Sequence, residues 1–190
     1  FRNVEDRELT DEDVEGFAWT RCGVDWGYAV DPWVFVRVAY DRKTKTVYVF
    51  DEDRGLRLSN EQTASRIKAR LSDEDRDGSP TYLPRAPRNR VYADAAEPKS
   101  VASYRAQDID CRAAAKWPGS VEEGIQWLQT RAKIVIDRKR CPLAYQEFSA
   151  YEYEVDKDGK TLESYPDRDN HAIDAVRYAL SPLIADKKEV

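Results

Sequence analysis

The chain has 190 residues, enough for one substantial hydrophobic core, so a single domain is the default expectation. Hydrophobic residues make up 41% of the sequence and charged residues 35%, which is typical of a folded globular protein and excludes a disordered one. The net charge of −5 does not favour a nucleic-acid-binding protein, although carboxylates concentrated at a metal site would be compatible with one.

Other features bear on the origin and compartment of the chain. It begins with Phe1 and contains no methionine, so we expect it to be a fragment of a longer protein. No apolar run approaches the roughly 20 residues that cross a bilayer, and no signal peptide is visible, so we expect no membrane partner. The odd number of cysteines, Cys22, Cys111 and Cys141, disfavours a disulfide framework and favours a reducing compartment.

The order of the predicted elements indicates one α/β domain with a mixed sheet and helices on both faces. Residues 1–18 are acidic and aperiodic, which is typical of a linker from an upstream domain. β-Branched and aromatic runs then predict three strands in an antiparallel meander, at 20–28, 33–40 and 46–51. Later strands, predicted at 90–95, 109–116 and 133–138, alternate with helices predicted at 59–71, 97–107, 120–131, 142–151 and 170–185.

Local signals refine the second half of the chain. Ser120 and Glu123 have the spacing of a capping box at the start of a helix. The segment 151–165 contains Asp-Gly between alternating strands, which predicts a hairpin. We expect the domain to cover residues 19–186, with a short tail at 187–190.

The first predicted strand contains a charged residue in an unusual setting. In the run Thr20–Tyr28, Asp25 lies on the same face as Gly23 and Gly27, because side chains alternate along a strand. Burying an unpaired carboxylate is costly, so it needs a compensating partner. The glycines would leave Asp25 accessible to a large ligand. A satisfied structural aspartate or a bulge is the alternative interpretation.

A second aspartate ends a later strand. In "VYADAAEP", Asp94 follows an apolar run directly and precedes a predicted helix. Ligands of open α/β sheets gather at the carboxyl ends of strands, which makes Asp94 a candidate site residue. Alternatively, Asp94 caps the helix that starts near Pro98. Glu97 could lie near a metal, or it could interact with the positive end of that helix.

The last predicted helix carries the third signal. In "DRDNHAIDAVRYAL", His171 and Asp174 share a helical face because they are three residues apart, and His171 is the single histidine of the chain. This pattern also fits a solvated polar face. Asp169 is a competing carboxylate, which we interpret as a helix cap.

Carboxylates from two strands and a late helix are suited to bind hard cations such as Mg²⁺ or Mn²⁺. Two such ions about 4 Å apart can activate water and stabilise the leaving oxygen in phosphodiester cleavage. They would also compensate the charge of Asp25.

The meander and the positions of the three aspartates resemble the RNase H-like nuclease superfamily. More narrowly, "VDWGY", "YADAAEP" and "DNHAIDAVRYAL" resemble the C-terminal nuclease domain of the large terminase subunit of tailed bacteriophages, over roughly residues 20–185. The His-x-x-Asp helix followed by an Arg-Tyr-Ala run is the most specific of these motifs.

The resemblance implies an RNase H-like fold and a divalent-metal-dependent endonuclease that cuts concatemeric viral DNA during packaging. It implies Asp25, Asp94 and Asp174 as metal ligands for two Mg²⁺ or Mn²⁺ ions, with His171 beside them as a ligand or proton-transfer group. It also implies double-stranded viral DNA, the terminase small subunit and the capsid portal as partners, in the host-cell cytoplasm. The isolated domain is expected to be monomeric.

The sequence contains no Gly-rich P-loop followed by Lys-Ser/Thr, so we expect no ATPase activity in this fragment. Two alternatives stay open at this point. One is another RNase H-like nuclease, such as a Holliday-junction resolvase or a ribonuclease H. The other is a non-catalytic domain that docks on a partner protein and keeps its carboxylates for structure.

Overall fold

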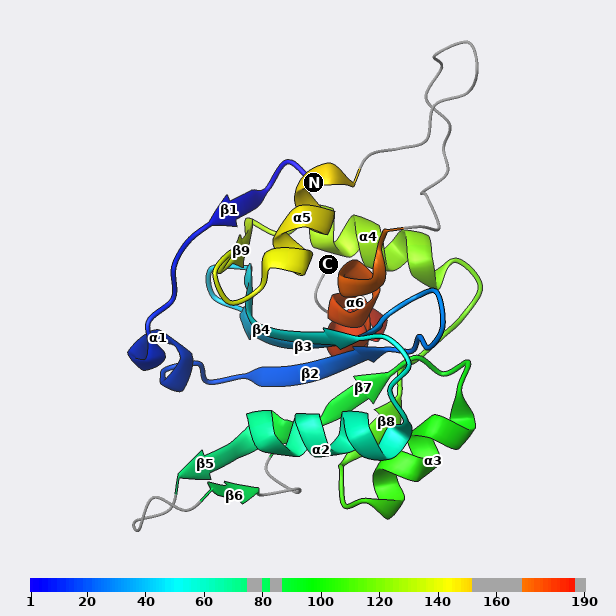
Figure 1. The fold of residues 1–190 in the computed structure, drawn as a ribbon. Coiled ribbons are helices and arrows are strands. Elements are labelled where there is room, and N and C mark those ends of the chain that lie inside the picture. The colour runs from blue at the N-terminus through cyan, green and yellow to red at the C-terminus, as the bar shows by residue number, and fades with distance from the viewer. Residues whose placement is uncertain (75–79, 83–86, 152–168, 187–190) are drawn as a thin grey trace.

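A central sheet with the strand order β1-β9-β4-β3-β2-β7-β8 organises the protein (Figure 1). The computed structural model describes residues 1–74, 80–82, 87–151 and 169–186. The strands of this sheet are β1 (Val4–Asp6), β2 (Thr20–Asp25), β3 (Trp33–Asp41), β4 (Thr46–Gly55), β7 (Val91–Ala93), β8 (Cys111–Ala113) and β9 (Lys133–Ile136). A separate pair is formed by β5 (Ser72–Glu74) and β6 (Pro80–Tyr82).

The predicted meander and the mixed sheet are confirmed. Strand β3 pairs antiparallel with both β2 and β4, whereas β7 pairs parallel with β2 and β9 pairs parallel with β4. Parallel neighbours place their carboxyl ends at the same edge of the sheet. The ends of β2 and β7 therefore lie side by side.

Helices cover both faces of the sheet, as predicted (Figure 1). They are α1 (Asp11–Glu15), α2 (Asn60–Leu71), α3 (Pro98–Ala106), α4 (Ser120–Gln129), α5 (Pro142–Ala150) and α6 (His171–Ala185), with a 3-10 turn at Pro87–Asn89. Helices α4, α5 and α6 share one core with the face of β3 that carries Val34, Val36 and Val38. Helices α2 and α3 pack on the opposite face, against Cys22 and Val24 of β2.

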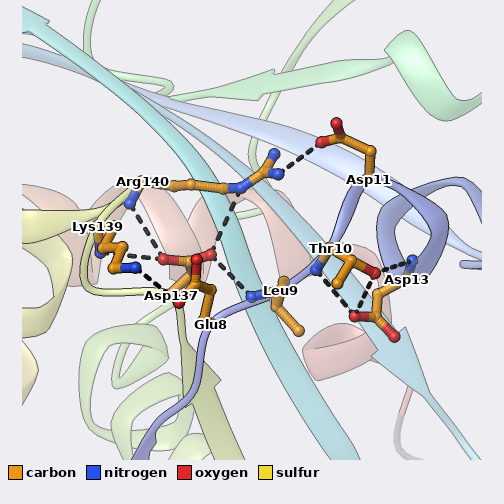
Figure 2. A network of polar contacts seen from close by, with 8 residues as sticks. All are labelled: Glu8, Leu9, Thr10, Asp11, Asp13, Asp137, Lys139 and Arg140. Carbon is orange, nitrogen blue, oxygen red and sulfur yellow. Dashed lines mark hydrogen bonds and ion pairs between the residues drawn. The ribbon is translucent and has the colours of Figure 1, made fainter.

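Residues 1–18, which we expected to be a linker, pack against the sheet. Strand β1 pairs parallel with β9, and the N–H of Leu9 donates a hydrogen bond of 2.9 Å to the buried carboxylate of Asp137. Figure 2 shows the ion pairs beside this contact, between Lys139 and Glu8 and between Arg140 and Asp11. This segment lacks a strong period because β1 has only three residues, so sequence patterning could not place it.

The predicted capping box of α4 is not formed, and two predicted segments lie outside the described residues. Gly119, with φ of 84°, occupies the N-cap position of α4, so Ser120 falls in the first helical turn and makes no capping box. The expected hairpin at 151–165 lies outside the described residues apart from Tyr151, and the tail at 187–190 lies outside them as well. In the described part of the chain, no helix is long and apolar enough to cross a membrane. The three cysteines are buried, free thiols.

Candidate functional site

The four predicted site residues converge on one cavity of about 530 Å³. Asp25 is the last residue of β2, and Asp94 directly follows β7. His171 begins α6, and Asp174 lies in its first turn. The N–H of Asp94 donates to the carbonyl oxygen of Val24 at 3.1 Å, which continues the β2–β7 ladder and holds the two aspartates at the same edge.

Helix α6 reaches this edge because it packs very closely on β2. A Cβ atom added to Gly23 would lie 1.8 Å from the carbonyl oxygen of Ala175. A Cβ atom added to Gly27 would lie 2.3 Å from the carbonyl oxygen of Asp31, within its own loop. Our expectation that both glycines clear space for a ligand is therefore wrong. Gly23 makes room for the helix that carries His171, and Gly27 allows a tight turn beside the site.

Asp25 is buried and hydrogen-bonded to His171. Its Oδ2 atom lies 3.0 Å from Nδ1 of His171, and only 8% of the residue is exposed. Burial raises the pKa of Asp25 to about 6; the charges of Asp174 and Asp94 raise it further, whereas the hydrogen bond to His171 lowers it. The same hydrogen bond is the main reason that the pKa of His171 is raised. The hydrogen bond between them thus favours the charged form of each side chain.

The loop after β2 contributes a further acidic group. The Nε2 atom of His171 lies 3.6 Å from Oδ1 of Asp31, and Asp31 also lines the cavity. Nδ1 of His171 is engaged by Asp25, so Nε2 is the ring nitrogen on the side of Asp31. The ring is thus held between two carboxylates from the same strand–loop segment.

Asp94 is held from several directions. Its Oδ1 atom accepts a hydrogen bond of 3.1 Å from the N–H of Ala96 and forms an ion pair with the ammonium group of Lys116. Its carbonyl oxygen accepts a hydrogen bond of 2.9 Å from the indole of Trp26. Asp94 does not cap α3, because Glu97 occupies the N-cap position of that helix.

Asp174 is paired with an arginine one helical turn later. Arg177 donates from Nη2 and Nε to Oδ1 of Asp174, at 2.8 and 3.1 Å. The side chain of Arg177 is only 7% exposed and also reaches the carbonyl oxygen of Ser120. A guanidinium fixed in this way limits the orientations that the carboxylate can adopt.

The structure also shows where Asp169 and Glu97 lie, for which the sequence allowed two roles each. Asp169 lines the cavity and has φ of 51°, but the N-cap residue of α6 is Asn170, so our interpretation of Asp169 as a helix cap is wrong. Asp169 lies one residue before the N-cap position of that helix. Glu97 is exposed, makes no side-chain capping hydrogen bond, and is not among the residues that line the cavity.

Sequence reasoning did not identify Glu147, which fixes the start of α6. From α5, its buried carboxylate accepts hydrogen bonds from the N–H groups of Ala172 and Ile173, at 2.7 and 3.2 Å. These groups belong to the first turn of α6, which has no side-chain cap of its own. Burial raises the pKa of Glu147 to about 7, against the two hydrogen bonds, which lower it. In the sequence, the only indication of this role was an acidic residue within the helix predicted at 142–151.

The donor set of this cavity fits a hard divalent cation. Carboxylate oxygens are the ligands that Mg²⁺ and Mn²⁺ prefer. The charges of Asp94 and Asp174 both raise the pKa of Asp25, so the three carboxylates repel one another, and a bound cation would relieve this repulsion. Over the described ranges, however, no three His, Cys, Asp or Glu side chains are already gathered around one point. Lys116 and Arg177 contact Asp94 and Asp174 instead, and the His171 ring contacts Asp25.

The fold and the site together define an RNase H-like α/β domain, with aspartates at the ends of β2 and β7 and on the last helix. The chain belongs to the terminase RNase H-like domain family, whose model matches residues 25–182. The predicted fold class and the predicted family are therefore confirmed.

Two phage-related proteins show the same relationship. The chain is 34% identical over 178 residues to the terminase large subunit of Bacillus phage SPP1, covering 93% of this chain and 39% of that protein. It is 28% identical over 170 residues to the PBSX phage terminase large subunit of Bacillus subtilis strain 168, covering 89% and 36%. The chain thus spans less than two fifths of the length of these relatives.

A solved structure matches nearly the whole chain. The nuclease domain of the SPP1 large terminase, solved with bound Mn, superimposes with a TM-score of 0.81 and 33% identity, covering 96% of this chain and 97% of that domain. The chain is therefore a homologue of terminase nuclease domains.

Proposed function

We propose that this domain is a divalent-metal-dependent endonuclease that cuts double-stranded viral DNA within a packaging terminase. The observation that carries the proposal is the convergence of Asp25, Asp94, Asp174 and His171 on one cavity, in a chain of the terminase RNase H-like family. The bound Mn of the homologous SPP1 domain supports it.

Asp25, Asp94 and Asp174 are the residues that would hold the ions, which we propose to be two Mg²⁺ or Mn²⁺. When bound, such ions supply an activated water and charge stabilisation at the leaving oxygen of a phosphodiester. The protein supports this by orientation. Arg177 fixes the carboxylate of Asp174, and the carboxylate of Glu147 fixes the first turn of α6.

His171 is suited to act as an additional ligand or to move a proton. Asp25 engages its Nδ1 atom, so Nε2 is the nitrogen that can accept or donate a proton on the other side of the ring. The hydrogen bond to Asp25 raises the pKa of His171, which favours the protonated imidazole as a proton donor.

Membership of the family supports a proposal for the substrate and the partners. We propose double-stranded viral DNA as substrate, and the terminase small subunit and capsid portal as partners of the full protein in the host cytoplasm. The net charge of −5 implies weak DNA affinity for the domain alone, because phosphate binding depends on released counterions. Other parts of the terminase would then supply the missing contacts.

Cleavage of supercoiled plasmid tests this proposal. The purified domain should nick the plasmid with Mn²⁺ or Mg²⁺ and should lose this activity in EDTA. Asp25→Asn and Asp174→Asn preserve side-chain size and should each lower the cleavage rate by at least roughly 100-fold. Loss of a residue that only hydrogen-bonds to a metal ligand already costs about 10- to 100-fold in activity, and loss of the ligand itself should cost more. Circular dichroism checks that both variants are folded.

Asp169→Asn is the matched control, because Asp169 lines the same cavity and asparagine tolerates its left-handed backbone. This variant should cut at a rate close to that of the parent. Full activity in the Asp25 and Asp174 variants would refute the assignment. Preferential cutting of four-way junctions or RNA–DNA hybrids over duplex DNA would instead indicate a resolvase or a ribonuclease H.

A further inference from the structure

Lys116 belongs to no motif of the sequence, yet it contacts one of the carboxylates that line the cavity. It follows β8, the edge strand next to β7, and it lines the same cavity as the four predicted site residues. Its ammonium group forms an ion pair with Oδ1 of Asp94 and lies 5.6 Å from the ring centroid of Tyr178. A protein cation thus occupies one face of a carboxylate that we assign to metal binding.

The cationic side chains that the structure describes at this cavity differ in how firmly they are held. Arg177 is 7% exposed, donates twice to Asp174, and packs so closely on Gly124 that a Cβ atom there would lie 3.0 Å from its Cδ atom. His171 is 21% exposed and is the first residue of α6, whose first turn is hydrogen-bonded to Glu147. Lys116 is 44% exposed and lies on a segment outside the helices and strands. Its flexible stem can therefore swing away at the smallest cost.

We propose that Lys116 is a displaceable counter-cation for Asp94. It neutralises this carboxylate before metal binds, leaves it when a divalent cation arrives, and then contacts a DNA phosphate at the mouth of the cavity. The inference rests on the proposed function, because it assumes that Asp94 binds metal and that DNA is the substrate.

Charge and reach support both halves of this exchange. An ammonium group and a divalent cation repel each other, so each weakens the binding of the other to the carboxylate of Asp94. Once displaced, Lys116 stays at the rim of a cavity to which a phosphodiester must come, and lysine binds phosphate as a mobile point charge. Lys116 would thereby link metal loading to DNA binding. It is a positioning residue for the carboxylate and a binding residue for the substrate.

Calorimetric titration of Mn²⁺ tests the first half without any cleavage. Lys116→Ala removes the competing cation, so the Kd for Mn²⁺ should fall by about 3- to 10-fold. Lys116→Gln, which keeps the length of the side chain, should show the same change. Lys133→Ala is the matched control, since Lys133 also forms a close ion pair, with Glu5 at 2.5 Å, but lies on β9, several strands away from β8. The Kd of the Lys133→Ala variant for Mn²⁺ should equal that of the parent.

Duplex binding tests the second half. Affinity for a 30-bp DNA is measured in Ca²⁺ over a series of salt concentrations. The slope of log K against log salt should decrease in magnitude by about one for Lys116→Ala, the loss expected for one phosphate contact, and should not change for Lys133→Ala.

The possible results separate the two proposals. A parent domain that binds no Mn²⁺ would refute the proposed function itself. A parent that binds Mn²⁺, with both Lys116 variants binding it no more tightly, would overturn only the displacement. Tighter Mn²⁺ binding with an unchanged salt slope would overturn the phosphate contact.

Discussion

The substitution Gly23→Ala tests whether the approach of α6 to β2 builds the site. The new Cβ atom would lie 1.8 Å from the carbonyl oxygen and 2.7 Å from the carbonyl carbon of Ala175. Both atoms belong to the backbone, so no side-chain rotation can relieve the contact. Helix α6 would have to move away by roughly 1.5 Å, which strains a core that is packed as densely as a crystal.

The expected cost is about 3 kcal/mol of unfolding free energy, the upper end of the range for overpacked cores. With an m-value of about 2 kcal/mol/M, the urea midpoint should fall by roughly 1.5 M. The same movement separates Asp25 on β2 from His171 and Asp174 on α6. Affinity for Mn²⁺ should therefore fall as well, measured in the absence of urea on the protein that remains folded.

Gly16→Ala is the control, because Gly16 has an ordinary right-handed conformation with φ of −71° and its Cβ atom would lie 3.3 Å from the nearest oxygen. Its effect should stay within about 1 kcal/mol. A Gly23→Ala variant with the urea midpoint and Mn²⁺ affinity of the parent would refute the claim that this contact sets the distance between β2 and α6.

Two pH dependences follow from the raised pKa values. Metal ligands must lose their protons, so the affinity for Mn²⁺ should rise with pH through about 6, the pKa of Asp25, and metal binding should release protons. Calorimetry in buffers of different ionisation enthalpy measures the number of protons released. An affinity for Mn²⁺ that does not change with pH would contradict this prediction. Glu147 has a pKa raised from 4.5 to about 7, so its contribution to stability is fully present below pH 4.5 and is lost as the pH rises through about 7. The stability of Glu147→Gln relative to the parent should therefore increase from pH 5 to pH 8, by at most about 3 kcal/mol. If the difference in urea midpoint between variant and parent is the same at pH 5 and at pH 8, this role of Glu147 is excluded.

Patterning predicted most of the fold because the long elements have clear periods. The strands β3 and β4 and the helices α2, α4 and α6 were placed within a few residues of their observed bounds. The short edge strand β1 was missed, since three residues carry no period and its pairing depends on β9, far away in the chain. Ser120 was misplaced by one position because the left-handed backbone of Gly119 is not visible in a spacing rule.

The site was predicted as a set of residues but not as a set of contacts. The cavity contains Asp25, Asp94, His171 and Asp174, as the motifs indicated. Which cationic group meets each carboxylate depends on elements that only the fold brings together, such as Lys116 after β8. The role of Gly23 was misread for the same reason. Its neighbour Ala175 lies on α6, about 150 residues later in the sequence, and no local pattern connects them.

The central claim is that these aspartates hold divalent cations. Crystals of the domain grown with MnCl₂ and measured at the manganese absorption edge test it most directly. We expect anomalous difference peaks inside the cavity, within bonding distance of carboxylate oxygens of Asp25, Asp94 and Asp174. An empty cavity at Mn²⁺ concentrations that support plasmid nicking, or manganese bound only elsewhere on the protein, would contradict it.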